Sequence, residues 1–197
     1  DSDANVNVFV INNSSFKIKD LDIVGKVAYQ GNTYEGITGD LGSQYDVTMA
    51  GPIQVPDALQ SKVTVYYTTV ETPTRDVEDS NNGWTTSVSD YSTIKTYLIK
   101  FNSSVEMSVG ETYDFYYPIE MPNTTANLLK KTYFNHGIYF NRITEAGTLE
   151  GRVTSPKLGV QMARKYDLNL TLFKPYTMQI VPGGKYILTD EDGNKTT

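Results

Sequence analysis

The stretch Ser61-Lys-Val-Thr-Val-Tyr-Tyr-Thr-Thr-Val70 decides the fold class. Its residues are almost all β-branched or aromatic, which are the residue types that favour strands. Because side chains alternate between the two faces of an extended chain, Val63, Val65 and Tyr67 share one face. The stretch therefore predicts a β-strand.

The same pattern recurs along most of the chain. Stretches with alternating or β-branched character are separated by Gly, Pro, Asn and Asp, which are typical of turns. Further strands are expected at residues 5–11, 22–29, 94–101, 112–119 and 138–143, whereas residues 125–133 allow a helical turn or two. With roughly ten strands, the predicted fold is all-β, a two-sheet Greek-key β-sandwich of the immunoglobulin-like type.

The strand pattern pauses at Ala163-Arg164-Lys165, and a new strand with leucine at alternate positions begins at Tyr166. We therefore expect a sandwich domain over residues 1–165 and a short C-terminal β segment over residues 166–197. A segment of that size cannot bury a core of its own. It is expected to be the start of a second domain, or a segment that adds a strand to something else.

The composition excludes several classes of function. Of the 197 residues, 17 are Lys or Arg and 23 are Asp or Glu, so the net charge is −6. This balance argues against a nucleic-acid partner and against an anionic membrane surface. No stretch is apolar for the ~18 residues that a membrane-spanning helix needs, so membrane insertion is not expected.

The chain has no cysteine and one histidine. Thiol catalysis, disulfides and metal sites built from several histidines are therefore excluded. His136 lies between Asn135 and Gly137, where we interpret it as a turn residue rather than a catalytic base. Since nothing singles out one pair among the 23 acids for glycoside hydrolysis, no catalytic residue is predicted and the chain is expected not to be an enzyme.

The segment from Glu71 to Asp90 differs in character from the rest and predicts a long surface loop, the most mobile part of the first domain. It holds several acids, and Asp76, Glu78 and Asp79 are candidate ligands for calcium. A solvated acidic loop without a metal is the alternative interpretation. No other cofactor is expected.

The only tryptophan, Trp84, lies in the same loop. An indole ring can stack on an apolar face of a ligand such as a sugar ring. Trp84 is therefore the candidate ligand-binding residue.

Two sets of residues resemble a known class of protein. The first is Val63 to Glu71, Asn82-Gly-Trp84, Ile94 to Ile99 and Val109 to Pro118; the second is Tyr166-Asp-Leu-Asn-Leu-Thr-Leu-Phe-Lys174 with Val181-Pro-Gly-Gly-Lys-Tyr-Ile-Leu-Thr-Asp-Glu-Asp-Gly-Asn194. The first set resembles the stalk sandwiches of cell-wall-anchored adhesins and backbone pilins of Gram-positive bacteria. The second resembles the opening of a collagen-adhesin B-type (prealbumin-like) domain.

The resemblance implies a structural stalk or spacer module, extracellular and cell-wall-anchored or fimbrial, that projects a binding tip. It also implies that Lys174 is a candidate for an intramolecular isopeptide cross-link, with a solvent-facing lysine as the alternative. The implied partners are neighbouring domains of the same polypeptide, other copies of the chain, and host extracellular matrix or glycan. The alternative function is an adhesin domain that recognises host glycan or matrix protein through residues 71–90.

Overall fold

The computed structural model describes residues 4–36, 38–122, 129–161, 188–189 and 195–196. The chain divides into two compact units, Asp1–Ala163 and Arg164–Thr197. The strands of the first unit are β1 (Ala4–Ile11), β2 (Ile18–Lys26), β3 (Thr48–Met49), β4 (Val63–Thr68), β5 (Thr96–Phe101), β6 (Glu106–Met107), β7 (Thr112–Glu120), β8 (Lys131–Phe134), β9 (His136–Thr144), β10 (Gly147–Thr154) and β11 (Leu158–Gln161). Short 3₁₀ turns are η1 (Asp57–Leu59), η2 (Ser80–Asn82) and η3 (Tyr91–Thr93).

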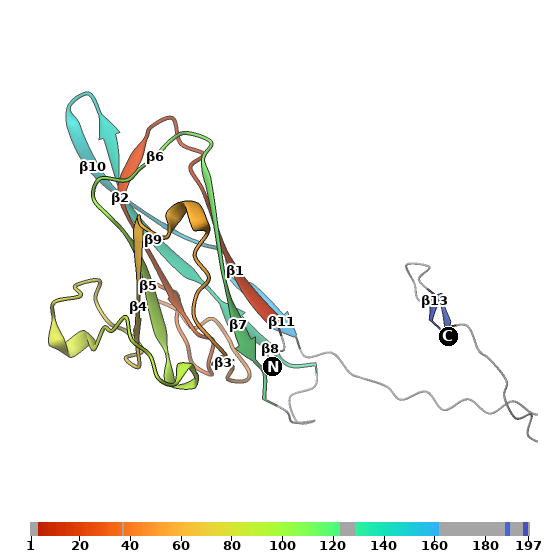
Figure 1. The fold of residues 1–197 in the computed structure, drawn as a ribbon. Helices are drawn as coiled ribbons and strands as arrows, with labels where there is room; N and C mark the ends of the chain where they lie inside the picture. Colours follow the sequence, from red (N-terminus) through yellow and green to blue (C-terminus); the bar gives the residue numbers. More distant parts are fainter. Residues whose placement is uncertain (1–3, 37, 123–128, 162–187, 190–194, 197) are drawn as a thin grey trace, which may run out of the picture. The chain divides into compact units, whose positions relative to one another are not determined.

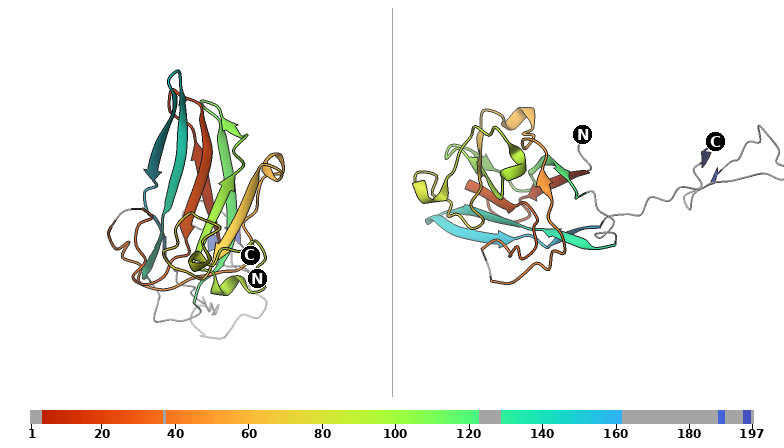
Figure 2. Two further views of the ribbon diagram at one scale, coloured as in Figure 1. Left: turned by 90° about the vertical axis from the view of Figure 1, so that its left-hand side faces the viewer. Right: turned by 90° about the horizontal axis from the view of Figure 1, so that it is seen from below.

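These strands form an antiparallel sandwich, which confirms the predicted fold class. A three-stranded sheet has the order β1-β7-β3, and a six-stranded sheet has the order β10-β9-β2-β5-β4 with β6 also paired to β2. A further pair joins β11 to β8. Most neighbours in the sheets are not consecutive in sequence, so the chain crosses repeatedly between the two layers, as in a Greek key (Figures 1 and 2).

The core lies between the two larger sheets. Every second residue of β1 from Val6 to Val10 is buried, and so is every second residue of β7 from Tyr113 to Ile119. Across the core, the ring of Tyr97 on β5 meets the ring of Tyr117 edge-on, with their centroids 5.2 Å apart. Because each buried aliphatic or aromatic side chain contributes about 1.5–3 kcal/mol, this core supplies the stability that a chain without disulfides needs.

The six-stranded sheet is also covered on part of its outer face. Val24 and Leu98 are buried there, outside the main core, and the covering segments 29–36 and 70–95 bond to this face through Thr33, Glu35 and Arg75. The covering segments are tied to the sheet, since the Thr68 hydroxyl donates a hydrogen bond to the Asn82 carbonyl at 2.7 Å. The other part of this face stays open.

The described part of the first unit begins and ends at the same end of the sandwich. Ala4, the first residue of β1, lies opposite Ile119 near the end of β7. Gln161, the last residue of β11, lies opposite Lys131 at the start of β8. The β9–β10 hairpin marks the other end (Figure 1).

In the second unit, β12 (Leu188–Thr189) pairs antiparallel with β13 (Lys195–Thr196). The predicted strand at 166–174, including Lys174, lies outside the described residues, so its cross-link remains a prediction. Residues 125–128 of the predicted helical segment also lie outside them. The helical prediction is wrong for residues 131–133, which belong to strand β8 because they pair with β11.

Candidate functional site

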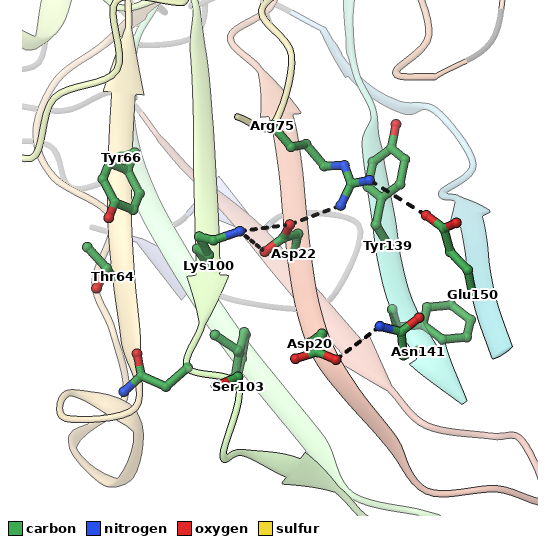
Figure 3. A pocket seen from close by; sticks show the side chains of 13 residues that line it. Asp20, Asp22, Thr64, Tyr66, Arg75, Lys100, Ser103, Tyr139, Asn141 and Glu150 are labelled. Carbon is green, nitrogen blue, oxygen red and sulfur yellow. Dashed lines mark hydrogen bonds and ion pairs between the residues drawn. The ribbon is translucent and has the colours of Figure 1, made fainter. Parts of the chain in front are cut away.

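A row of polar side chains crosses the open part of the outer face of the six-stranded sheet. Tyr139 on β9 is directly opposite Asp22 on β2, Asp22 is opposite Lys100 on β5, and Lys100 is opposite Thr64 on β4. Side chains at directly opposite positions of antiparallel strands lie on one face within contact distance. The register of the four strands therefore brings these groups together (Figure 3).

Asp22 lies at the centre of the row and is paired with two cations. The Lys100 ammonium lies 3.3 Å from each oxygen of its carboxylate, and the Arg75 guanidinium donates to it at 3.0 Å. Because the Asp22 side chain is only 7% exposed, its charge would be costly to bury without such partners. Arg75 also lies 4.0 Å above the ring of Tyr139 and 3.9 Å from Glu150, which fixes it in place.

These residues surround a hollow of about 430 Å³, here called the outer-face hollow. Its lining comprises Asp20, Asp22, Thr64, Tyr66, Arg75, Lys100, Phe101, Asn102, Ser103, Tyr139, Phe140, Asn141 and Glu150. Three carboxylates face two cations among them, so the hollow carries a net charge of −1. Figure 3 shows Lys100, Asp22 and Arg75 side by side at its centre, with Glu150 toward one edge and Asp20 beside Asn141.

Asp20, which lines this hollow, lies at a β-bulge in β2. The register of β2 against β9 shifts between Lys19 and Asp22, and Asp20 has a φ of 51°, a left-handed conformation that is unusual for a residue other than glycine. Asp20 and Asp22 both line the hollow, as expected for residues two positions apart on a strand, and Asp20 accepts a hydrogen bond from the Asn141 amide at 3.0 Å. Bulges are common next to functional sites.

A second polar cluster lies under the covering segments beside the hollow. The Lys26 ammonium donates to the Thr33 hydroxyl at 3.0 Å and lies 3.9 Å from the Glu35 carboxylate. Burial lowers the pKa of Lys26 and raises the pKa of Glu35, and the attraction between the two groups opposes both shifts. Tyr139 joins the two clusters, because its hydroxyl donates to Glu35 at 3.1 Å while its ring supports Arg75.

His136 is not the turn residue that the sequence indicated. It is the first residue of β9, its side chain is buried, and its Nε2 is hydrogen-bonded to the Tyr97 hydroxyl. Because Gly137 follows inside the same strand, the Asn-His-Gly sequence does not form a turn here. Burial lowers the pKa of His136 to about 4, so the imidazole is neutral in the folded protein at pH 7.

The loop residues predicted from sequence as ligand contacts do not line the outer-face hollow; they are Asp76, Glu78, Asp79 and Trp84. Trp84 is half-buried, and its indole N–H donates to the Thr74 carbonyl at 2.9 Å. The Asp76 carboxylate accepts from the Glu78 N–H at 3.0 Å, and the Asp79 carboxylate from the Asn81 N–H at 2.9 Å. Within the described ranges, no three acids or histidines are grouped closely enough to hold a metal ion.

The loop residue that reaches the hollow is Arg75, which sequence reasoning missed together with Asp20 and Asp22. The sequence offered one signal for Arg75, because it is a basic residue in an acidic loop. Nothing near it in the sequence indicated that its partner is Asp22, 53 positions earlier. The site offers paired charges, hydroxyls and amides, most of them on paired strands.

Fold and site together define the class: an antiparallel β-sandwich with a polar, charge-paired hollow on the outer face of its larger sheet. Comparison of the chain with protein-family models, with curated proteins and with solved structures finds no match. In the portion of the chain that the structure describes, no helix is long and apolar enough to cross a membrane.

Proposed function

We propose that this chain is a non-enzymatic structural module of an extracellular bacterial surface protein of the adhesin or pilus type. The observation that carries the proposal is that the sandwich begins and ends, at Ala4 and Gln161, at the same end (Figure 1). A domain whose two ends lie together is held from one end and has its opposite end free. That arrangement suits display at a surface.

The position of the ends also refines the expected spacer role. A spacer that carries load in line is entered at one end and left at the opposite end. Here a pull on the two ends would peel β1 away from β7 and β11 away from β8, one pair of residues at a time. We therefore place the module at a tip or on a side branch of the surface protein, next to neighbouring domains of the same polypeptide.

Labelling of intact cells tests the proposal. Antibodies raised against the sandwich are expected to label unpermeabilised cells of the producing organism and to detect the protein in the cell-wall fraction. A cytosolic protein detected only after permeabilisation is the control. Labelling of the sandwich only after permeabilisation would contradict an extracellular location.

A second function is favoured by Arg75: recognition of host glycan or matrix protein through residues 71–90. Arg75 is the residue of this loop that lines the outer-face hollow and is held there by Asp22 and Tyr139. The loop and the sheet thus form one surface at this point. Binding and display are compatible, because the hollow faces outward from the sheet.

A further inference from the structure

We infer that the outer-face hollow binds a neutral, polyhydroxylated ligand, which means an uncharged saccharide. This inference rests on the second of the two proposed functions and names its ligand class. It is drawn from the charge balance of the hollow, from the hydrogen-bonding groups that surround it, and from the rigidity of their supports.

The charge balance disfavours ionic ligands. Arg75 and Lys100 are both bound to Asp22, so an anionic ligand would have to compete with a buried carboxylate for them. It would also meet the carboxylates of Asp20 and Glu150, whereas a cationic ligand would meet the two cations. A neutral ligand disturbs none of these pairs and avoids the cost of leaving a buried charge without its partner.

The hydrogen-bonding groups match hydroxyls. Asp20 uses one carboxylate oxygen to accept from Asn141, and its other oxygen offers an acceptor. The side-chain amide oxygen of Asn141 is a second acceptor. The hydroxyls of Thr64 and Tyr66 can both donate and accept. A ligand hydroxyl also donates and accepts, so adjacent sugar hydroxyls can pair with such a mixed set, while the half-exposed ring of Tyr66 offers an apolar surface for a sugar ring.

The hollow is also pre-organised. Most of its polar groups are carried by β2, β4, β5, β9 and β10, which are paired strands of one sheet, and the loop residue Arg75 is held by Asp22. The bulge holds Asp20 in a left-handed conformation that the chain would not adopt without a constraint. The volume of about 430 Å³ falls within the range of ~300–1,000 Å³ that is usual for small-ligand sites.

The test uses the full chain on an array of neutral, acidic and basic oligosaccharides, followed by titration calorimetry with the neutral saccharide that binds best. Thr64→Phe fills the hollow, and Asp20→Asn removes the anionic acceptor while keeping the side-chain shape and the tolerance for positive φ. Asp114→Asn removes an exposed carboxylate from β7, in the other sheet, and is the matched control. Circular dichroism melting establishes that each variant is folded.

We expect a neutral saccharide to bind, with Kd raised about tenfold by Asp20→Asn, since a hydrogen bond to a charged group is replaced by a weaker one to a neutral amide. Thr64→Phe should abolish binding, and Asp114→Asn should leave it unchanged. Absence of binding to any neutral saccharide would overturn the inference, as would binding that survives Thr64→Phe. Binding restricted to charged saccharides and lost in Thr64→Phe would overturn the ligand class but leave recognition at the hollow standing, and no outcome of this test bears on surface location.

Discussion

His136 makes the stability of the protein depend on pH. The buried imidazole has a folded-state pKa of about 4, below the ~6.5 of an unfolded histidine, so between these values only the unfolded chain takes up the proton. Stability from this group is therefore intact above pH 6.5 and is lost as the pH falls towards 4. We expect lowering the pH from 7.5 to 5.0 to reduce the free energy of unfolding through His136 by about 2 kcal/mol.

Urea unfolding at the two pH values measures this loss, and His136→Gln is the control because it cannot titrate. The variant loses the imidazole contact to Tyr97 at both pH values, so only the change between pH 7.5 and pH 5.0 is compared. Glu35, whose pKa is raised by burial, changes protonation equally in both proteins. An identical pH-dependent loss in wild type and His136→Gln would contradict the assignment.

Asn82 is expected to hold the 71–90 loop in place. Its side chain is buried, donates to the Thr74 hydroxyl at 2.7 Å and to the Asp76 carbonyl at 2.8 Å, and accepts from the Thr74 N–H. Asn82→Ala leaves these groups without their partner, which should cost about 1–3 kcal/mol. Limited trypsin digestion should show faster cleavage after Arg75 in Asn82→Ala.

The matched control is Asn81→Ala, one position earlier, where the exposed side chain bonds only within its own turn to Asp79. Its cleavage rate and melting temperature should stay close to those of the wild type. If Asn82→Ala and Asn81→Ala were cleaved equally fast, Asn82 would not be what anchors the loop. The loop would then be better described as the mobile segment that its acidic composition predicts.

At the scale of elements, alternation was enough to predict most strands. The stretches around Val8 and Phe115 alternate between buried and exposed residues, and both form strands close to their expected bounds. The stretch around Val65 also forms a strand, although its burial does not alternate. The bulge at Asp20 could not be predicted, because it arises where β2 must pair with β9 on one side and β5 on the other. The sequence allows a helical turn at residues 131–133, where the structure has a strand, because pairing with β11 is a long-range contact that leaves no local periodicity.

The bulge gives β2 a specific requirement at position 20. Because Asp20 has a φ of 51°, a β-branched replacement is strained there, whereas asparagine tolerates the left-handed region. We expect Asp20→Val to be less stable than Asp20→Asn by about 1–3 kcal/mol in urea unfolding. Asp22→Val is unsuitable as a control because it breaks a buried charge pair, so Thr112→Val, at an exposed position of β7, serves instead. Equal stability of Asp20→Val and Asp20→Asn would mean that the bulge relaxes at no cost.

For the whole molecule, the sandwich follows from the strand pattern, but the site does not. Asp22 and Lys100 meet because of the register of β2 against β5, and Arg75 reaches them from the 71–90 loop, so three separate segments form the cluster. Register is set by the packing of whole strands, so it is not readable from the neighbours of any one residue. Trp84 and the loop acids stood out in the sequence by composition, yet their bonds are made within their own loop.

The position of the two ends predicts how the sandwich responds to force. With an N-terminal handle and a single cysteine at Gln161→Cys, a pull acts at one end of the sandwich and peels the ladder of β1 against β7 rung by rung. With the cysteine instead at Glu145→Cys, between β9 and β10 at the opposite end, the same pull acts along the strands. The hydrogen bonds between β1 and β7 then bear the force together. Both attachments are unambiguous, because the natural chain has no cysteine.

Single-molecule force spectroscopy at one pulling speed is expected to give a lower mean unfolding force for the Gln161→Cys geometry, since forced unfolding follows the rate of crossing the unfolding barrier and peeling strains one pair of hydrogen bonds at a time. The two variants should have equal urea midpoints, because both substitutions are at exposed positions. A Gln161→Cys geometry that resisted as much force as Glu145→Cys would restore the in-line spacer as the better role. A lower unfolding force for the Gln161→Cys geometry would favour a module that is displayed and does not carry tension.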